Sequence, residues 1–182
     1  MKTALLIIDV QNDYFENGRM PLVNAKEASE KAKNVLNLFR EKKLPVIHIQ
    51  HISTRPAATF FLPNTDGIAI HENVKPAENE KVIIKNFPNS FKDTELLKYL
   101  NEESITELVI CGMMTQNCVD STVRAAKDYD FNCVVIGDAC ATKDLEVNGQ
   151  TVKAEQVQIA FLASLNYYFA KVKTLEQYID EA

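Results

Sequence analysis

The chain has 182 residues, of which 46% are hydrophobic and 25% charged, and this composition predicts one globular domain spanning residues 1–182. The net charge of −5, with acidic and basic residues interspersed, leaves no basic stripe, and no apolar run approaches the roughly 20 residues that cross a bilayer. We therefore expect neither a nucleic acid nor a membrane as partner. The lack of C-x-x-C spacing favours a reducing cytoplasm and argues against disulfides and zinc; the four cysteines are Cys111, Cys118, Cys133 and Cys140.

Short apolar runs rich in β-branched residues alternate with helical patterns along the chain. The runs predict strands at 4–10, 44–52, 81–87, 107–113, 133–139 and 170–175. Apolar residues at helical spacing predict helices at 25–42, 93–101, 118–129, 153–166 and 175–181. This alternation indicates a doubly wound α/β sandwich with a parallel sheet. Residues 53–80 show no regular pattern, and we expect them to form part of a lid or an oligomer contact.

In a doubly wound sheet, ligands bind beyond the carboxyl ends of the strands, so polar residues at these ends are candidate functional groups. Asp9 follows the first apolar run, Lys85 ends the run "KVIIK", and Cys118 lies in the turn after "ELVICGM". If they converge, they provide a base, a cation and a nucleophile. The simpler alternative for Asp9 and Lys85 is a structural ion pair.

Cys118 differs from the other cysteines because it follows a turn and begins a predicted helix. Thr115 would serve as N-cap, and the positive end of the helix dipole, with Lys85 as a nearby cation, would lower the thiol pKa below its usual value of about 8.5. Backbone N–H groups of residues 112–118 could also form an oxyanion hole. Cys111 and Cys133 lie inside strand runs and are expected to be small buried residues.

The histidines do not predict a metal site. His48 and His51 are three residues apart on a strand and therefore point to opposite faces. We expect no cofactor either, because the chain has neither G-x-G-x-x-G nor a P-loop. His48 is expected in the core and His51 in the pocket. Further residues could line a pocket, with core packing as the equal alternative for the aromatic ones: Phe15 or Tyr14, Phe60 or Phe61, Phe91 and Asn117.

Three segments resemble the isochorismatase-like cysteine hydrolases, a superfamily that includes nicotinamidases and N-carbamoylsarcosine amidohydrolases. They are "LLIIDVQNDYF", "VIIKNFPNSF" and "VICGMMTQNCVDSTVRAAKDYDFNCVVIGDAC", in the family's order and spread over most of the chain. The resemblance implies a three-layer α/β/α sandwich with a six-stranded, Rossmann-like parallel sheet. It also implies an Asp9–Lys85–Cys118 triad, a cis peptide between Met113 and Met114, and an oxyanion hole made by the Met114 and Cys118 amides.

One departure from the family pattern concerns whether the protein binds a metal ion. Metal-dependent nicotinamidases carry an Asp-x-His-type motif after the second strand, whereas this chain has "QHISTRP". The resemblance is therefore closer to the metal-free members, which implies no metal and no cofactor, and it makes nicotinamide a less favoured substrate.

The function implied by the resemblance is hydrolysis of an amide or related C–N bond of a small molecule through a thioester on Cys118. It also implies a homo-oligomer, a dimer or larger. Two alternatives remain open from the sequence: a vinyl-ether hydrolase of the isochorismatase type, and an oligomeric binding module without catalysis.

Overall fold

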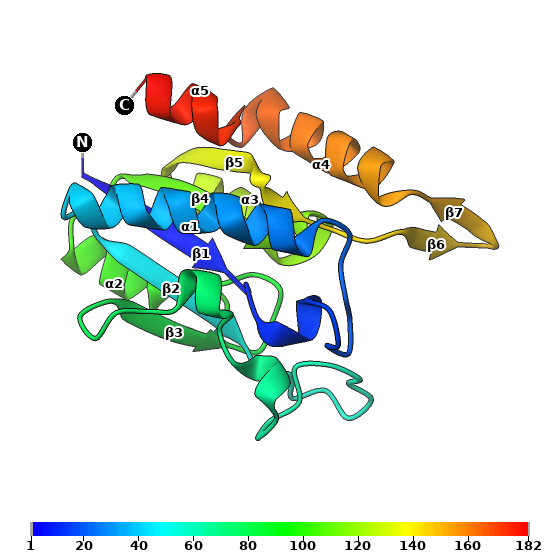
Figure 1. Ribbon diagram of the computed structural model, residues 1–182. Helices are drawn as coiled ribbons and strands as arrows, with labels where there is room; N and C mark the ends of the chain where they lie inside the picture. The colour runs from blue at the N-terminus through cyan, green and yellow to red at the C-terminus, as the bar shows by residue number, and fades with distance from the viewer. Residues whose placement is uncertain (1, 182) are drawn as a thin grey trace.

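A computed structural model describes residues 2–181, and its central feature is a six-stranded parallel sheet with helices on both faces (Figure 1). The strand order is β3-β2-β1-β4-β5-β8, and all neighbouring strands are parallel. The strands are β1 (Thr3–Ile8), β2 (Val46–His51), β3 (Lys81–Lys85), β4 (Glu107–Met113), β5 (Asn132–Ala141) and β8 (Lys171–Lys173). The predicted three-layer α/β/α sandwich is confirmed, and the expected strand ends move by at most two residues.

Five α-helices cover the sheet: α1 (Ala25–Glu41), α2 (Leu96–Glu102), α3 (Asp120–Asp128), α4 (Ala154–Tyr168) and α5 (Leu175–Asp180). Helices α1 and α5 pack on one face, and α2, α3 and α4 pack on the other, so two hydrophobic cores form. Because both faces are covered, residues 4–8 of β1 and 108–113 of β4 are all buried. This double burial explains why these strands appear in the sequence as continuous apolar runs.

The strand order reverses between β1 and β4. After β1 the chain adds β2 and β3 on one side, and it then returns to pair β4 with the other edge of β1. Ligand sites in open α/β sheets lie at such a switch point, beyond the carboxyl ends of the strands. The loops that follow β1 and β4 are therefore the first place to look for a site.

A hairpin, β6 (Leu145–Val147) and β7 (Gln150–Val152), was not predicted from the sequence. It projects beyond the body of the molecule between β5 and α4 (Figure 1). Its turn residues Asn148 and Gly149 both have positive φ, which is the backbone that an Asn-Gly hairpin turn requires. The sequence signal "VNGQ" was present, but the strands are too short and too exposed to show an apolar alternation.

Residues 53–80 contain two short 3-10 helices, η2 (Asp66–Ile68) and η3 (Glu72–Val74). The segment lies against the end of β1, because the N–H of His71 donates to the Val10 carbonyl at 2.9 Å. A role as a lid or oligomer contact stays a prediction. Within residues 2–181, none of the helices has the length and apolar character needed to span a membrane.

Candidate active site

Three side chains meet at the carboxyl edge of the sheet, at the switch between β1 and β4. Asp9 directly follows β1, Lys85 is the last residue of β3, and Cys118 lies in a π-helical turn, η4 (Thr115–Val119), that follows β4. Lys85 Nζ is 2.8 Å from Asp9 Oδ2, and both side chains are fully buried. Asp9 and Cys118 place a carboxylate oxygen and the sulfur within 4.8 Å of each other. The structure therefore brings together the three residues that the strand ends suggested.

Lys85 is held by more than its ion pair with Asp9. Its Nζ donates to the carbonyl oxygens of Phe87 at 3.0 Å and Pro88 at 3.3 Å, and it lies 3.1 Å from His51 Nδ1. Burial opposes its charge, but Asp9 and Cys118 together outweigh burial and raise the pKa of Lys85. The side chain is thus a fixed ammonium at neutral pH.

The turn that carries Cys118 is π-helical, whereas the sequence predicted an α-helix beginning at this residue. The Met114 carbonyl accepts hydrogen bonds from the N–H groups of Asn117 at 3.1 Å and Val119 at 3.2 Å. Helix α3 begins only at Asp120. Single π-helical turns are rare and occur often at functional sites.

Thr115 is not the N-cap that the sequence suggested. Met114 occupies that position, and the peptide bond between Met113 and Met114 is cis. The Thr115 hydroxyl turns inward instead, where it donates to Gln158 Oε1 at 2.7 Å and to the Ala141 carbonyl at 3.2 Å. The reason for the difference is that a hydroxyl buried beside β5 and α4 must bond to these elements rather than to its own turn.

The prediction of a lowered thiol pKa at Cys118 is wrong. Burial and the neighbouring Asp9 carboxylate raise the pKa of Cys118, and Lys85 opposes them only in part. The side chain is also buried, since Cys118 is only 3% exposed. The dipole argument failed because it omitted both the burial of the thiol and the pairing of Lys85 with Asp9. The resting residue is a thiol.

His51 lies beside the triad in register with Lys85. Its backbone is fixed by Gln11, whose carboxamide donates to the His51 carbonyl at 2.9 Å and accepts from the His51 N–H at 2.7 Å. Burial lowers the pKa of His51 to about 4, since the nearby Asp9 only partly compensates and Lys85 lowers it further. The imidazole is therefore neutral at pH 7. Because Lys85 donates to Nδ1, the ring proton is on Nε2.

One group of described residues could offer three metal ligands: Asp9, His51 and Cys118, whose ligand atoms all lie within 4.8 Å of one another. The Lys85 ammonium is already within 3.1 Å of Asp9 and His51. A positive charge that belongs to the chain itself thus stands among these ligands. The Lys85 ammonium therefore contacts the same Asp9 and His51 atoms that a divalent ion would need as ligands.

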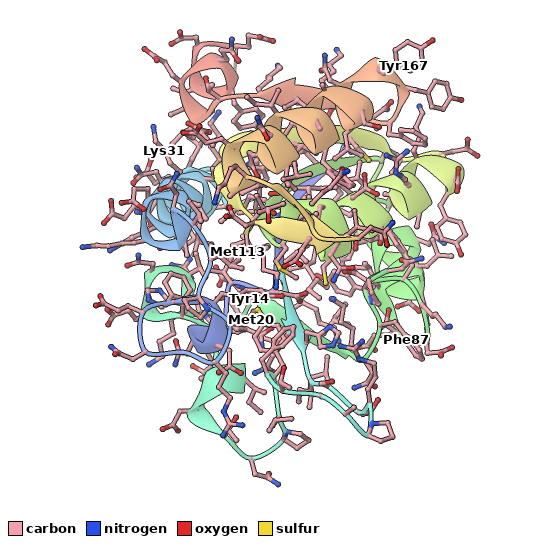
Figure 2. All side chains as sticks on the ribbon, turned by 90° about the vertical axis from the view of Figure 1, so that its right-hand side faces the viewer. Tyr14, Met20, Lys31, Phe87, Met113 and Tyr167 are labelled. Carbon is pink, nitrogen blue, oxygen red and sulfur yellow. The ribbon has the colours of Figure 1, made fainter. Side chains whose placement is uncertain are left out.

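Two further residues near the triad are buried: Asp13, which the sequence did not single out, and Tyr14, which was the alternative to Phe15 as a pocket residue. Asp13 accepts hydrogen bonds from the N–H groups of Phe61 at 2.6 Å and Arg19 at 3.1 Å, so it fastens the 53–80 segment to the loop after β1. Tyr14 is also buried, and its ring packs 4.6 Å from that of Phe61. Burial, Cys118 and the Asp9 carboxylate raise the pKa of Tyr14, which stays a neutral phenol. Figure 2 shows Tyr14 and Met113 near the centre of the molecule.

The predicted pocket residues lie in different parts of the structure. Phe60 packs against Tyr14 at 5.8 Å and joins the aromatic group next to the triad, and Asn117 is half-buried in η4. Phe15 stacks on His71 at 3.7 Å, where both line a cavity of about 550 Å³ that contains no triad residue. The remaining aromatic candidate is a core residue rather than a pocket residue: Phe91 packs between Tyr129 and Phe131.

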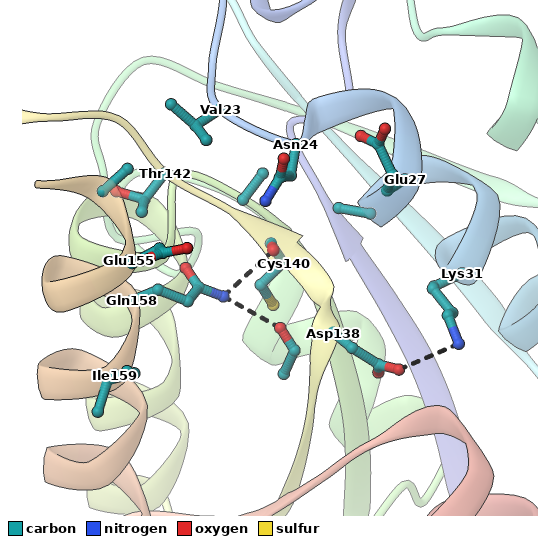
Figure 3. Close-up of a pocket in the computed structure, with 14 residues that line it drawn as sticks. Val23, Asn24, Glu27, Lys31, Asp138, Cys140, Thr142, Glu155, Gln158 and Ile159 are labelled. Carbon is teal, nitrogen blue, oxygen red and sulfur yellow. Dashed lines mark hydrogen bonds and ion pairs between the residues drawn. The ribbon is translucent and has the colours of Figure 1, made fainter.

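A second cavity, of about 640 Å³, opens between α1, α4 and the end of β5 (Figure 3). Its walls include Lys31, which pairs with Asp138 at 3.4 Å, and Gln158 of α4. None of the triad residues lines this cavity, although Gln158 bonds to the first residue of η4.

Comparisons with known proteins identify the family of this chain. A model of the isochorismatase domain matches residues 3–177. The chain belongs to the isochorismatase family. An uncharacterized isochorismatase family protein from Bacillus subtilis, YddQ, is 50% identical over 179 residues, which are 98% of this chain and 99% of the relative. This family membership confirms the resemblance that the three sequence segments carried.

Two further proteins that are similar to this chain are named as hydrolases. A crystal structure described as that of an isochorismatase hydrolase from Oleispira antarctica superimposes with a TM-score of 0.94 at 46% identity, covering 98% of this chain and 96% of the other. Streptothricin hydrolase from Streptomyces noursei is 32% identical over 142 residues, which are 78% of this chain and 50% of that longer protein. The chain therefore has the fold of the isochorismatase-family hydrolases.

Proposed function

We propose that this protein is a cysteine-dependent hydrolase that cleaves an amide or a related C–N bond of a small molecule without a cofactor. The observation that carries the proposal is the fully buried Asp9–Lys85 ion pair, with its 2.8 Å contact, next to the Cys118 thiol. An ion pair that served stability alone would not need a cysteine beside it at the switch point of the sheet.

The first half of the reaction forms a thioester. Asp9 accepts the proton of the Cys118 thiol as the sulfur attacks the substrate carbonyl carbon. The backbone N–H groups of Met114 and Cys118 donate hydrogen bonds to the oxyanion. Collapse of this intermediate breaks the C–N bond, and the proton held by Asp9 passes to the departing ammonia or amine.

The second half returns the enzyme to its resting state. Asp9 takes a proton from a water molecule that attacks the thioester carbonyl, and the carbon–sulfur bond then breaks. The sulfur recovers the proton as a thiol, and the carboxylic acid product leaves. Lys85 stays protonated throughout, because its pKa is raised, and its positive charge stays 2.8 Å from Asp9 Oδ2.

This scheme depends on a neutral thiol that is deprotonated only during attack. The raised pKa of Cys118 supports such general-base activation over a preformed thiolate. The name of the related streptothricin hydrolase supports a hydrolytic reaction, while it leaves the substrate of this chain open.

The test is a screen for ammonia or amine release over small carboxamides, ureido compounds and N-carbamoyl amino acids, with isochorismate as a vinyl-ether substrate. Cys118→Ala should lower kcat by about 10⁴-fold or more, since it removes the nucleophile. Cys133→Ala is the matched control, because Cys133 is buried and pairs with Leu108 at the amino end of the strands, opposite the edge that carries the triad. Intact mass spectrometry after acid quenching should find the acyl group on Cys118.

Other outcomes of the screen would contradict the thioester scheme or favour another function. Amide turnover that persists in Cys118→Ala contradicts the thioester scheme. Turnover of isochorismate alone, unaffected by alkylation of Cys118, would assign vinyl-ether hydrolysis instead. Lack of turnover of every compound, with specific binding of some, would favour the non-catalytic binding module.

A further inference from the structure

Gln158 of α4 connects three elements through one carboxamide. Its Nε2 donates to the Gly137 carbonyl at 3.0 Å and to the Cys140 carbonyl at 3.2 Å (Figure 3). Its Oε1 accepts from the Thr115 hydroxyl at 2.7 Å. One side chain thus ties α4 and β5 to the first residue of the turn that carries Cys118.

The carbonyls that Gln158 binds lie at an irregularity of the sheet. The pairing of β4 with β5 runs regularly to Ile110 and Val135 and then resumes at Gly112 and Cys140. Four residues of β5 therefore stand opposite one residue of β4, and the bulge disturbs the hydrogen-bond ladder. Backbone carbonyls left in a buried bulge need another partner, and the Gln158 carboxamide provides it.

The contact with Thr115 transmits this support to the nucleophile. Thr115 is fully buried and lies three residues before Cys118. Its one hydroxyl proton is shared between Gln158 Oε1 and, at the longer distance of 3.2 Å, the Ala141 carbonyl, so the start of η4 is fixed to both α4 and the end of β5. Met114 and Cys118, whose amides are assigned to the oxyanion hole under the proposed function, lie on either side of this anchor.

We infer that Gln158 is a positioning residue for the nucleophile: through Thr115 it holds η4 in the conformation that keeps Cys118 buried beside Asp9. Only the expected effect of Gln158 on turnover rests on the proposed function. The geometric part concerns the accessibility of a thiol and can be measured without a substrate.

The experiment compares iodoacetamide labelling rates of all four cysteines, read by peptide mass spectrometry, in the full-length protein. Gln158→Met keeps the length of the side chain and removes its hydrogen bonds. We expect the labelling rate of Cys118, divided by that of Cys111, to rise about fivefold or more, the factor that corresponds to one lost hydrogen bond. Cys111 is the reference because it is fully buried in β4.

Matched variants separate positioning from general destabilisation. Gln156→Met places the same side chain at an exposed position of α4 and should leave the Cys118 to Cys111 ratio at the wild-type value. Thr115→Val should raise the ratio as Gln158→Met does, and the double variant should rise no further, because both remove the hydrogen bond between Thr115 and Gln158. Thr115→Ser, which keeps the hydroxyl, should change the ratio less than Thr115→Val.

Two results would overturn the inference: an unchanged ratio in Gln158→Met, or equal acceleration of all four cysteines, which would indicate a loss of global stability only. If the ratio rises in Gln158→Met while the wild-type protein hydrolyses none of the amides, the positioning role stands and the proposed function fails. If the protein hydrolyses amides, kcat should fall in Gln158→Met as the labelling ratio rises, with KM little changed.

Discussion

The protonation state of Cys118 depends on which of its surroundings has the larger effect on its pKa. Burial in a nearly closed site and the adjacent Asp9 carboxylate both favour the neutral thiol. Lys85 would favour the thiolate, but its charge is shared with Asp9 at 2.8 Å. A cysteine with this surrounding is protected from alkylation and oxidation while no substrate is bound, because the thiolate is the reactive form.

Replacement of Asp9 by Asn tests this electrostatic account. Asp9→Asn removes a cause of the raised pKa and leaves the charge of Lys85 without its partner. We expect the iodoacetamide labelling rate of Cys118 at pH 7.5 to rise about tenfold, although turnover is lost with the base. In the wild-type protein, the labelling rate should still increase with pH at pH 9, since the Cys118 pKa is raised.

Asp144→Asn is the control, because it makes the same charge change at the protein surface. A wild-type labelling rate that reaches a plateau below pH 8.5 would contradict the raised pKa. Equal labelling of Cys118 in the wild type and Asp9→Asn would show that the carboxylate does not act on the thiol.

At the residue level, the sequence predicted that Asp9, Lys85 and Cys118 converge, but it did not predict the protonation state of Cys118. Asp9 and Lys85 could be found because a charged residue at the end of an apolar strand run is conspicuous. The pKa of Cys118 depends on distances and burial that only the folded chain defines. Gln158 had no signal at all, since a glutamine in a helix of mixed pattern is usually exposed.

Among the elements, the connection between β4 and η4 sets the position of Cys118. Gly112 has a φ of +130°, and an added Cβ there would overlap the Ile8 carbonyl of β1. The glycine therefore allows β4 to approach β1 closely just before the turn that carries Cys118. Any larger residue would separate the two strands that flank the switch point.

Gly112→Ala is expected to lower the free energy of unfolding by about 3 kcal/mol, because it adds both backbone strain and an overlap with the Ile8 carbonyl. Gly149→Ala is a matched comparison: Gly149 also has positive φ, at +72°, but an added Cβ meets nothing within 4 Å. That variant should lose only about 1 kcal/mol, from strain. Urea unfolding of both proteins measures the difference, and equal losses would show that the overlap is unimportant.

The elements that the sequence predicted well are those with long periodic patterns. Strand β4 was predicted with its observed ends, because "ELVICGM" contains a continuous apolar run with no helical spacing. The π-helical form of η4 was missed, because hydrogen bonds of Thr115 and Met114 with distant and local partners decide it. Tertiary contacts of this kind leave no mark in local composition.

For the whole molecule, all three histidines become harder to protonate on folding. Burial lowers the pKa of His48 against the opposing effect of Glu80, and burial likewise lowers the pKa of His71. The pKa of His51 falls from 6.5 to about 4. The unfolded chain therefore binds more protons than the folded chain between these two values, and the free energy of unfolding must decrease as the pH falls through this window.

Glu80 adds a second loss at lower pH. Burial opposes its ionisation, but hydrogen bonds from Arg40, the Ala77 N–H and His48 outweigh burial and lower its pKa from 4.5 to about 2. A carboxyl with a lowered pKa stabilises the fold above 4.5, and this contribution disappears as the pH falls toward 2. As the pH falls, protonation of the histidines destabilises the fold first, and protonation of Glu80 does so at lower pH.

We therefore expect the midpoint of thermal unfolding to be constant near neutral pH, to fall between pH 6.5 and 4, and to fall further below pH 4.5. His71→Asn should reduce the slope of the first decline. Asn can still accept the hydrogen bond that His71 Nδ1 takes from the Asn73 N–H at the start of η3, but it has no proton to gain. Calorimetry in a series of buffers gives the curve for both proteins. A slope that is the same in His71→Asn, or a wild-type midpoint that is constant from pH 6.5 to 4, would mean that the histidines titrate alike in the folded and unfolded chains and that acid acts through other groups.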